Sequence, residues 1–113
     1  MRLTREDGTV IAEPLEVAST LLTRGLGLMG RSSLATGRGL LIEPCNGIHM
    51  MFMRFPIDAV FMDKRGRVVK VYEHLLPWIG LVPLVLRAHK VAELPAGTVR
   101  QHALKPGELL KVA

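Results

Sequence analysis

The sequence predicts a small α+β domain, mainly of β-structure, arranged as a barrel or a sandwich with two short helices. Three observations predict it: a length of 113 residues, short apolar stretches with alternating polarity, and turn signals between these stretches. A chain of this length buries one modest hydrophobic core, so we expect residues 1–113 to form a single domain. Only five residues are Phe, Trp or Tyr, so Leu, Val, Ile and Met must build most of that core.

A hairpin, a helix and a strand are expected in the first part of the chain. Asp7-Gly8 is a hairpin turn signal between RLTRE and TVIAEPLEV. Ser19 or Thr20 can cap a short helix within STLLTRGLGLMG, although its glycines weaken the later part. The stretch GLLIEP, residues 39–44, follows as a brief buried strand.

A long strand is expected from Met51 to Phe61, with a bend at Pro56. Every odd position in this stretch is apolar, while the even positions include charged residues, which indicates one core face and one polar face. A proline inside a strand is tolerated at a bend or bulge.

Three further elements complete the predicted fold. Asp63-Lys64-Arg65-Gly66 suits a type I turn into a returning strand, RVVKVYEH. RAHKVAEL predicts another strand, and Thr98 with Gln101 has the capping-box spacing of a short helix. The last strand is expected in ELLKV, residues 108–112.

The charge is strongly positive, at +5 with an isoelectric point near 10.0, so anionic partners need consideration. The basic residues are spread along the whole chain, and their densest run, residues 64–67, has no aromatic neighbour to stack on bases. We therefore expect no nucleic-acid partner.

The single cysteine, Cys45, excludes an intrachain disulfide framework and is compatible with a reducing compartment. The N-terminal stretch MRLTREDGTV is charged and shows no apolar signal-peptide region. From these observations we expect a cytoplasmic protein.

The longest apolar run is LLPWIGLVPLVL, residues 75–86, and it is interrupted by Pro77, Gly80 and Pro83. A membrane-spanning helix needs about 20 apolar residues, so no transmembrane segment is expected. The run predicts a loop or an irregular edge strand. If Trp78 and Leu81 are exposed, they would mark a contact patch for a homodimer or for a membrane surface.

Gly25, Gly27 and Gly30 have the G-x-G-x-x-G spacing of a dinucleotide-binding loop. Only six residues separate Gly30 from Gly37, whereas the crossover helix of such a site needs about ten or more. We therefore expect no dinucleotide, and the sequence predicts no other cofactor.

Cys45, His49 and His89 are the residues that could form a thiol or metal site. In an extended chain the side chains of Cys45 and His49 would lie ~13 Å apart, too far to share one metal ion. A buried free cysteine and a hydrogen-bonded histidine explain the same residues. Cys45 and His49 could form a cluster with His89 only if the fold brings their strands together, which the sequence does not show.

Arg54 and Asp58 flank the bend at Pro56 on the polar face of the expected strand. A catalytic carboxylate needs a second titratable group, and Glu43 is the nearest in sequence. A structural role for Asp58, accepting hydrogen bonds from loop amides or pairing with an arginine, is the interpretation that we favour.

The chain resembles domain-of-unknown-function family 192, small bacterial and archaeal proteins with a compact β-rich fold. The resemblance rests on TRGLGLMGRSSL, GRGLLIEPC, IHMMFMRFPIDAVFMDKRGRVV and AHKVAELPAGT, followed by PGELL. It places Cys45, His49, Arg54, Asp58 and His89 on motif positions. The chain departs from the pattern at Met50 and Met51, usually Thr and Phe, and at Lys90 and Ala92, usually Ser and Leu.

The sequence therefore favours a binding or accessory module for a small ligand or a protein, using the face around His49, Arg54, Asp58 and His89. The alternative is a metal- or thiol-dependent, hydrolase-like enzyme that uses Cys45, His49 and His89. Whether the protein is an enzyme at all stays open at this point.

Overall fold

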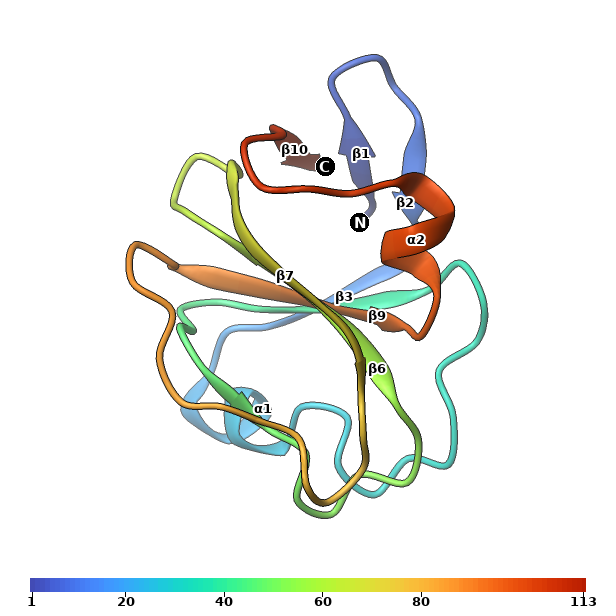
Figure 1. The fold of residues 1–113 in the computed structure, drawn as a ribbon, viewed down its shortest axis with the longest axis vertical. Helices are drawn as coiled ribbons and strands as arrows, with labels where there is room; N and C mark the ends of the chain where they lie inside the picture. Colours follow the sequence, from blue (N-terminus) through green and yellow to red (C-terminus); the bar gives the residue numbers. More distant parts are fainter.

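A five-stranded sheet forms the centre of the molecule, and smaller elements cover its two faces (Figure 1). The structure is a computed structural model that describes the backbone of residues 1–113 and every side chain except that of Leu21. The strands are β1 (Leu3–Arg5), β2 (Val10–Ala12), β3 (Leu15–Ala18), β4 (Gly39–Ile42), β5 (Ile48–His49), β6 (Ile57–Met62), β7 (Val68–Leu75), β8 (Leu81–Val82), β9 (Lys90–Pro95) and β10 (Leu110–Val112). The helices are α1 (Leu21–Leu26) and α2 (Thr98–His102).

The strands form three separate sheets. The central sheet has the order β3-β4-β9-β6-β7, in which only the β3–β4 pair is parallel. A second sheet has the order β10-β1-β2, and β5 pairs with β8 in a two-stranded ribbon. The mainly β, α+β class is thus confirmed. Of the two predicted arrangements, barrel-like or sandwich, a closed barrel is not confirmed, because none of the sheets in the described part of the chain closes on itself.

The central sheet separates two hydrophobic clusters. Val60 and Met62 of β6 pack into one cluster with β1, β2, β10 and α2. Ala59 and Phe61 pack into the other, which lies beneath the β5–β8 ribbon. Successive side chains of a strand point to opposite faces, so a central strand covered on both faces is apolar at every position that meets a core.

The strand expected from Met51 to Phe61 is shorter than predicted. It begins at Ile57, and all six residues of β6 are buried, including Asp58. Met51 lies in a turn and is half exposed, so its expected core position is wrong. The prediction failed because the alternating pattern assumed one solvated face, whereas β6 lies between β7 and β9 with both faces covered.

The predicted N-terminal elements are present. β1 and β2 form the hairpin around Asp7-Gly8, and α1 begins after Thr20, which shares a capping box with Thr23. TVIAEPLEV, expected as one strand, is divided at Pro14: β2 pairs with β1, and β3 pairs with β4. The chain thereby passes from the small sheet to the central one.

The glycine-rich stretch forms the end of α1 and the turn that follows it. Gly25 lies inside the helix, and Gly27 is its C-cap with φ of 48°. The helix thus precedes the last two glycines, whereas a dinucleotide-binding loop places its helix after them.

The cap of α2 differs from the prediction. Gly97 is the N-cap, and the Thr98 hydroxyl donates to the Pro95 carbonyl instead of capping the helix. The Asp58 carboxylate takes the capping role from a distant strand, accepting hydrogen bonds from the amides of Gly97 at 3.0 Å and Val99 at 2.9 Å. Sequence spacing alone did not indicate a cap supplied by another element.

The apolar run 75–86 folds back over the second hydrophobic cluster. Its β8 strand pairs with β5, placing Ile48 opposite Val82 and His49 opposite Leu81. The expected irregular edge strand is therefore present as half of the β5–β8 ribbon. In the described part of the chain, no helix has the length and apolar character needed to cross a membrane.

Candidate functional site

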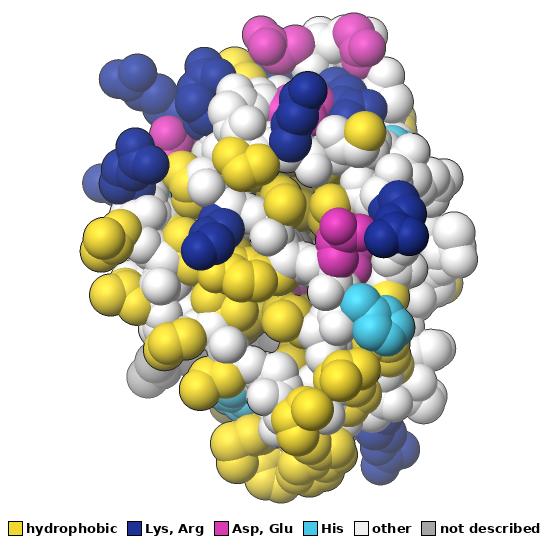
Figure 2. All heavy atoms as spheres, viewed as in Figure 1, with side chains coloured by type: hydrophobic (Ala, Val, Ile, Leu, Met, Phe, Trp, Pro, Cys, Tyr) yellow, Lys and Arg dark blue, Asp and Glu magenta, His cyan; other side chains and the backbone are white. Residues whose placement is uncertain are grey.

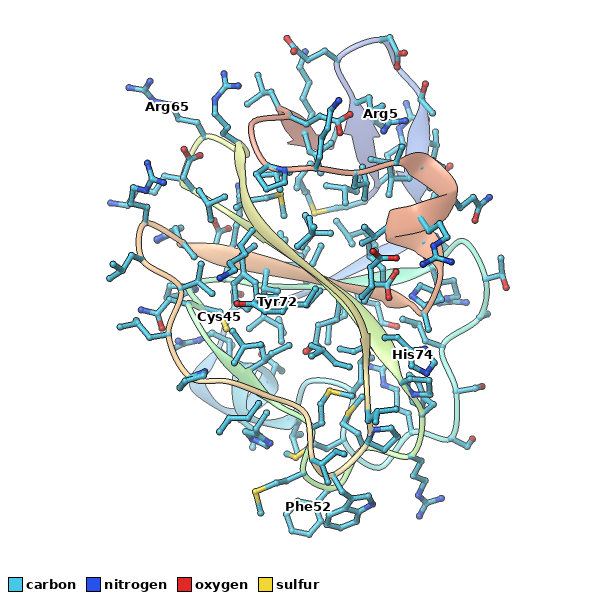
Figure 3. All side chains as sticks on the ribbon, in the orientation of Figure 1. Arg5, Cys45, Phe52, Arg65, Tyr72 and His74 are labelled. Carbon is cyan, nitrogen blue, oxygen red and sulfur yellow. The ribbon has the colours of Figure 1, made fainter. Side chains whose placement is uncertain are left out.

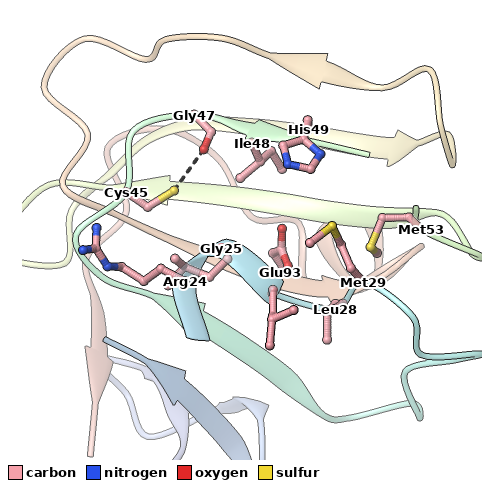
Figure 4. Close-up of a pocket in the computed structure, with 13 residues that line it drawn as sticks. Arg24, Gly25, Leu28, Met29, Cys45, Gly47, Ile48, His49, Met53 and Glu93 are labelled. Atoms are coloured by element: carbon pink, nitrogen blue, oxygen red, sulfur yellow. Dashed lines mark hydrogen bonds between the residues drawn. The ribbon is translucent and has the colours of Figure 1, made fainter. Parts of the chain in front are cut away.

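A cavity of about 230 Å³ lies between α1 and strand β5 (Figure 4). Its walls are mainly apolar, and its polar side chains come from four elements or loops. The apolar lining consists of Leu26, Leu28, Met29, Ile42, Ile48 and Met53, and the polar lining of Arg24, Cys45, His49 and Glu93.

Glu93 enters this cavity from the centre of the sheet. Its neighbours on β9, Ala92 and Leu94, point into the opposite hydrophobic cluster, so the alternation of the strand directs Glu93 to the cavity face. The residue is only 5% exposed. Among the described residues, no protein group donates a hydrogen bond or forms an ion pair with its carboxyl group. Its oxygens are not sealed inside the protein, because Arg24 Nε is the fully buried side-chain atom without a partner among the described residues. The carboxyl group therefore meets the space of the cavity.

Burial strongly affects the protonation of Glu93. Loss of hydration raises the pKa of the carboxyl group to about 7, and the positive charge of Arg31 opposes that shift only in part. The group therefore exchanges a proton near neutral pH. A cationic or hydrogen-bond-donating ligand would favour its ionised form.

Gly27 leaves space beside this carboxyl group. A Cβ atom at that position would lie 3.6 Å from Glu93 Oε1 and 3.7 Å from Ile42 Cδ1. Any side chain there would occupy the room next to the carboxylate, and the φ of 48° also favours glycine. The glycine thus makes the carboxyl group accessible from the cavity.

Cys45 is held in a partly buried position at the same cavity. Its thiol donates to the carbonyl of Gly47 at 3.0 Å, and its amide donates to the carbonyl of His89 at 2.7 Å. Burial raises the pKa of the thiol. The cysteine is therefore a neutral thiol at neutral pH, unlike an activated nucleophile.

Arg24 adds an unused donor near Cys45. Its Nη1 donates to the carbonyl of Pro44 at 3.2 Å. Its Nε is buried and has no hydrogen-bond partner among the described residues. A ligand with an acceptor atom could therefore be held by Arg24 while its donor group meets Glu93.

The residues expected to form the site do not all converge. Cys45 and His49 line the same cavity. His89 lies outside it, with Nε2 3.6 Å from Glu43 Oε2, and Arg54 is exposed. Across the residues that the structure describes, no three His, Cys, Asp or Glu side chains are placed to share a metal ion.

Asp58 lies on the other face of the sheet and holds the backbone in place. Besides the two amides at the start of α2, it accepts a hydrogen bond from the amide of His74 at 2.8 Å. His74 has a positive φ of 55° and is labelled in Figure 3. These three bonds match the structural interpretation of Asp58 made from the sequence.

Sequence reasoning missed Glu93. A usable signal was present, because KVAELP places an acidic residue two positions after Val91 on one face of a buried strand. An acidic residue in the middle of an otherwise apolar strand is rarely buried without a purpose.

Together, the fold and the site define a class of protein. It is a mainly β, α+β domain that has a cavity containing a carboxyl group beneath a two-stranded ribbon. The chain belongs to family DUF192, described as "Uncharacterized ACR", whose model matches residues 2–112. This match confirms the resemblance seen in the sequence motifs.

Two solved structures share the fold. A protein of unknown function from Novosphingobium aromaticivorans DSM 12444 is 23% identical with a TM-score of 0.84, covering 98% of this chain and 82% of that one. A protein from Sinorhizobium meliloti 1021, titled a "putative transcription regulator", is 26% identical with a TM-score of 0.81, covering 97% and 89%. A search of curated proteins gave no significant match.

Proposed function

We propose that this domain is a binding module for a small ligand that presents a positively charged or hydrogen-bond-donating group to Glu93. The observation that carries the proposal is the carboxyl group of Glu93, which is 5% exposed, faces a cavity and has no protein partner among the described residues. A complementary donor from a ligand would satisfy this group and offset the cost of its burial.

The size and lining of the cavity restrict the ligand. Its volume of about 230 Å³ is below the roughly 300–1,000 Å³ of pockets for drug-sized molecules. Leu28, Met29 and Ile48 offer apolar contacts around the carboxyl group. A short aliphatic amine, or the amine end of a longer molecule, has the matching chemistry.

Binding is better supported than thiol or metal chemistry. The thiol of Cys45 has a raised pKa, which opposes nucleophilic activation. Within the described residues, His89 does not join Cys45 and His49 around a common metal position. These observations favour the binding hypothesis over the hydrolase-like alternative.

The direct test compares small amines with neutral molecules of the same shape. We expect isobutylamine to shift the amide NMR signals of β9 and α1, and isobutanol to shift them much less, because only the amine can pair with an ionised Glu93. The Glu93→Gln variant keeps the size of the side chain and removes its charge, so it should lose the preference for the amine.

The matched control is Glu73→Gln, which removes a carboxylate from the exposed surface outside the cavity. This variant should keep the amine preference of the wild type. Equal responses of the wild type and Glu93→Gln to isobutylamine, or no response in either, would overturn the proposal.

A further inference from the structure

Large apolar side chains gather at one end of the molecule, outside the cavity. They come from the turn before β6 and from the segment between β7 and β9, and Figure 2 shows them as the yellow surface at the lower end of the view. Trp78 is 56% exposed and Ile79 is 74% exposed. We call this surface the apolar end, formed by Met51, Phe52, Trp78, Ile79 and Leu81.

The two turns of the apolar end support each other. The amide of Trp78 donates to the carbonyl of Met50 at 2.7 Å, and the rings of Phe52 and Trp78 meet edge to face at 5.0 Å. The aromatic side chains are thus held together at the surface, and Figure 3 shows Phe52 at the lower tip of the molecule.

Both aromatic residues adopt a backbone conformation that is unfavourable for them. Phe52 has φ of 63° and Trp78 has φ of 69°, in the left-handed region that bulky residues avoid. Exposed aromatic residues at such positions gain little from burial that would offset the strain. Strained positions of this kind concentrate at functional surfaces.

The charges around the apolar end have one sign. Residues 44–57 and 74–81, which build it, contain no Asp or Glu, and Arg54 lies beside Met53 and Phe55 in sequence. The carboxylates visible in Figure 2 lie toward the top and around the middle of the view, and none is seen at the lower end. A second copy of the chain would therefore bring a positive, acid-free surface against itself, without complementary charge.

We propose that the apolar end docks on an anionic lipid surface. Trp and Phe favour the interface between lipid headgroups and acyl chains, and a convex apolar tip can enter that layer without unfolding. Arg54, which is exposed next to the tip, then lies at the level of the negatively charged headgroups. This inference concerns a surface separate from the Glu93 cavity and does not depend on the ligand proposed there.

Trp78 is the single tryptophan of the chain, so its fluorescence reports directly on docking. We expect vesicles of phosphatidylcholine with phosphatidylglycerol to shift its emission to the blue, and brominated acyl chains to quench it. Vesicles of phosphatidylcholine alone should give a much smaller effect. An unchanged emission with anionic vesicles would overturn the proposal.

Variants separate docking from folding. Asn tolerates the left-handed region, so the double variant Phe52→Asn/Trp78→Asn should fold and yet no longer sediment with anionic vesicles. Val10→Asn, an exposed apolar residue on β2, is the control and should sediment as the wild type does. Unchanged sedimentation of the double variant would contradict the proposal.

A matched pair of variants tests how much positive charge contributes to vesicle binding. Arg54→Gln should weaken vesicle binding about fivefold, the usual contribution of one basic residue near an anionic surface, while Lys111→Gln on β10 should leave it unchanged. Light scattering without lipid gives the last check. A concentration-dependent dimer that Trp78→Asn abolishes would assign the apolar end to a second copy and overturn lipid docking.

Discussion

At the scale of single residues, two buried carboxylates on opposite faces of the same sheet have opposite surroundings. Asp58 accepts three backbone hydrogen bonds, whereas Glu93 faces a cavity without a protein donor among the described residues. The first arrangement stabilises the fold, and the second costs stability when the group is ionised. Such a cost is typical of a group retained for binding.

Glu93→Gln should therefore stabilise the protein at neutral and alkaline pH. The folded-state pKa of about 7 lies above the value of 4.5 for an exposed glutamate, so ionisation penalises the folded state increasingly between these two values. The variant should gain up to about 3 kcal/mol above pH ~7 and nothing below pH ~4.5. Urea unfolding at several pH values measures the difference, and a destabilised variant at pH ~8 would contradict it.

Asp58→Ala should have the opposite effect at every pH where the wild type folds. It leaves the amides of His74, Gly97 and Val99 without their acceptor, which should cost about 3–5 kcal/mol. Asp7→Ala, which removes an exposed turn carboxylate, should cost less than about 1 kcal/mol and serves as the control. Equal unfolding midpoints for the two variants would refute the structural role of Asp58.

At the scale of elements, β5 of the β5–β8 ribbon forms one wall of the cavity, and β8 carries Leu81 of the apolar end. Ile48 and His49 line the cavity, while Leu81 on the paired strand is exposed. Two-residue strands have no detectable period, so the sequence could not predict this pairing. The hairpin at Asp7-Gly8 and the cap at Thr20 were predictable because their signals are local.

The contrast between local signals and long-range contacts also explains which site residues the sequence predicted. Cys45 and His49 were named because reactive side chains are visible in the sequence, and they do share a cavity. Glu93 was missed because its meaning depends on which faces of β9 are buried. The contact of Asp58 with α2 joins residues about 40 positions apart, so it depends on the tertiary fold.

Gly47→Ala should displace the ribbon. A Cβ atom there would lie 2.5 Å from the carbonyl oxygen of Pro83 and 2.7 Å from that of Val82, both backbone atoms that cannot move independently. We expect faster hydrogen exchange at the Val85 amide, which donates to Asn46, and loss of amine binding.

Gly25→Ala is the control for this glycine substitution. Its Cβ atom would meet nothing within 4 Å, and alanine in a helix is favoured over glycine by about 0.5–1 kcal/mol. This variant should therefore gain stability and keep the exchange rates of the ribbon. Similar exchange in both variants would show that Gly47 is not required for the approach of the two strands.

At the scale of the whole molecule, the central sheet divides a closely packed layer from a layer that contains the cavity. On one face, the β10-β1-β2 sheet and α2 close over the first cluster. On the other, α1 and the two-residue strands of the ribbon cover the second cluster and leave the cavity. Both proposed surfaces, the Glu93 cavity and the apolar end, belong to the second layer.

This division predicts uneven local stability. Amides of β6 and β9, which pair on both sides, should exchange hydrogen at rates close to those of global unfolding. Amides of the ribbon should exchange much faster, because short exposed elements open locally. Uniform protection across both layers, measured by hydrogen exchange with mass spectrometry, would contradict the division.

The pH dependence of amine binding tests the central claim most directly. Isobutylamine should bind the wild type increasingly well as pH rises through about 7, because Glu93 then loses its proton, and His49→Gln should retain this dependence. Calorimetric titration across this range, repeated with Glu93→Gln, supplies the measurement. We predict that Glu93→Gln, unlike the wild type, binds isobutylamine weakly and without dependence on pH. Identical binding curves for Glu93→Gln and the wild type would contradict the account.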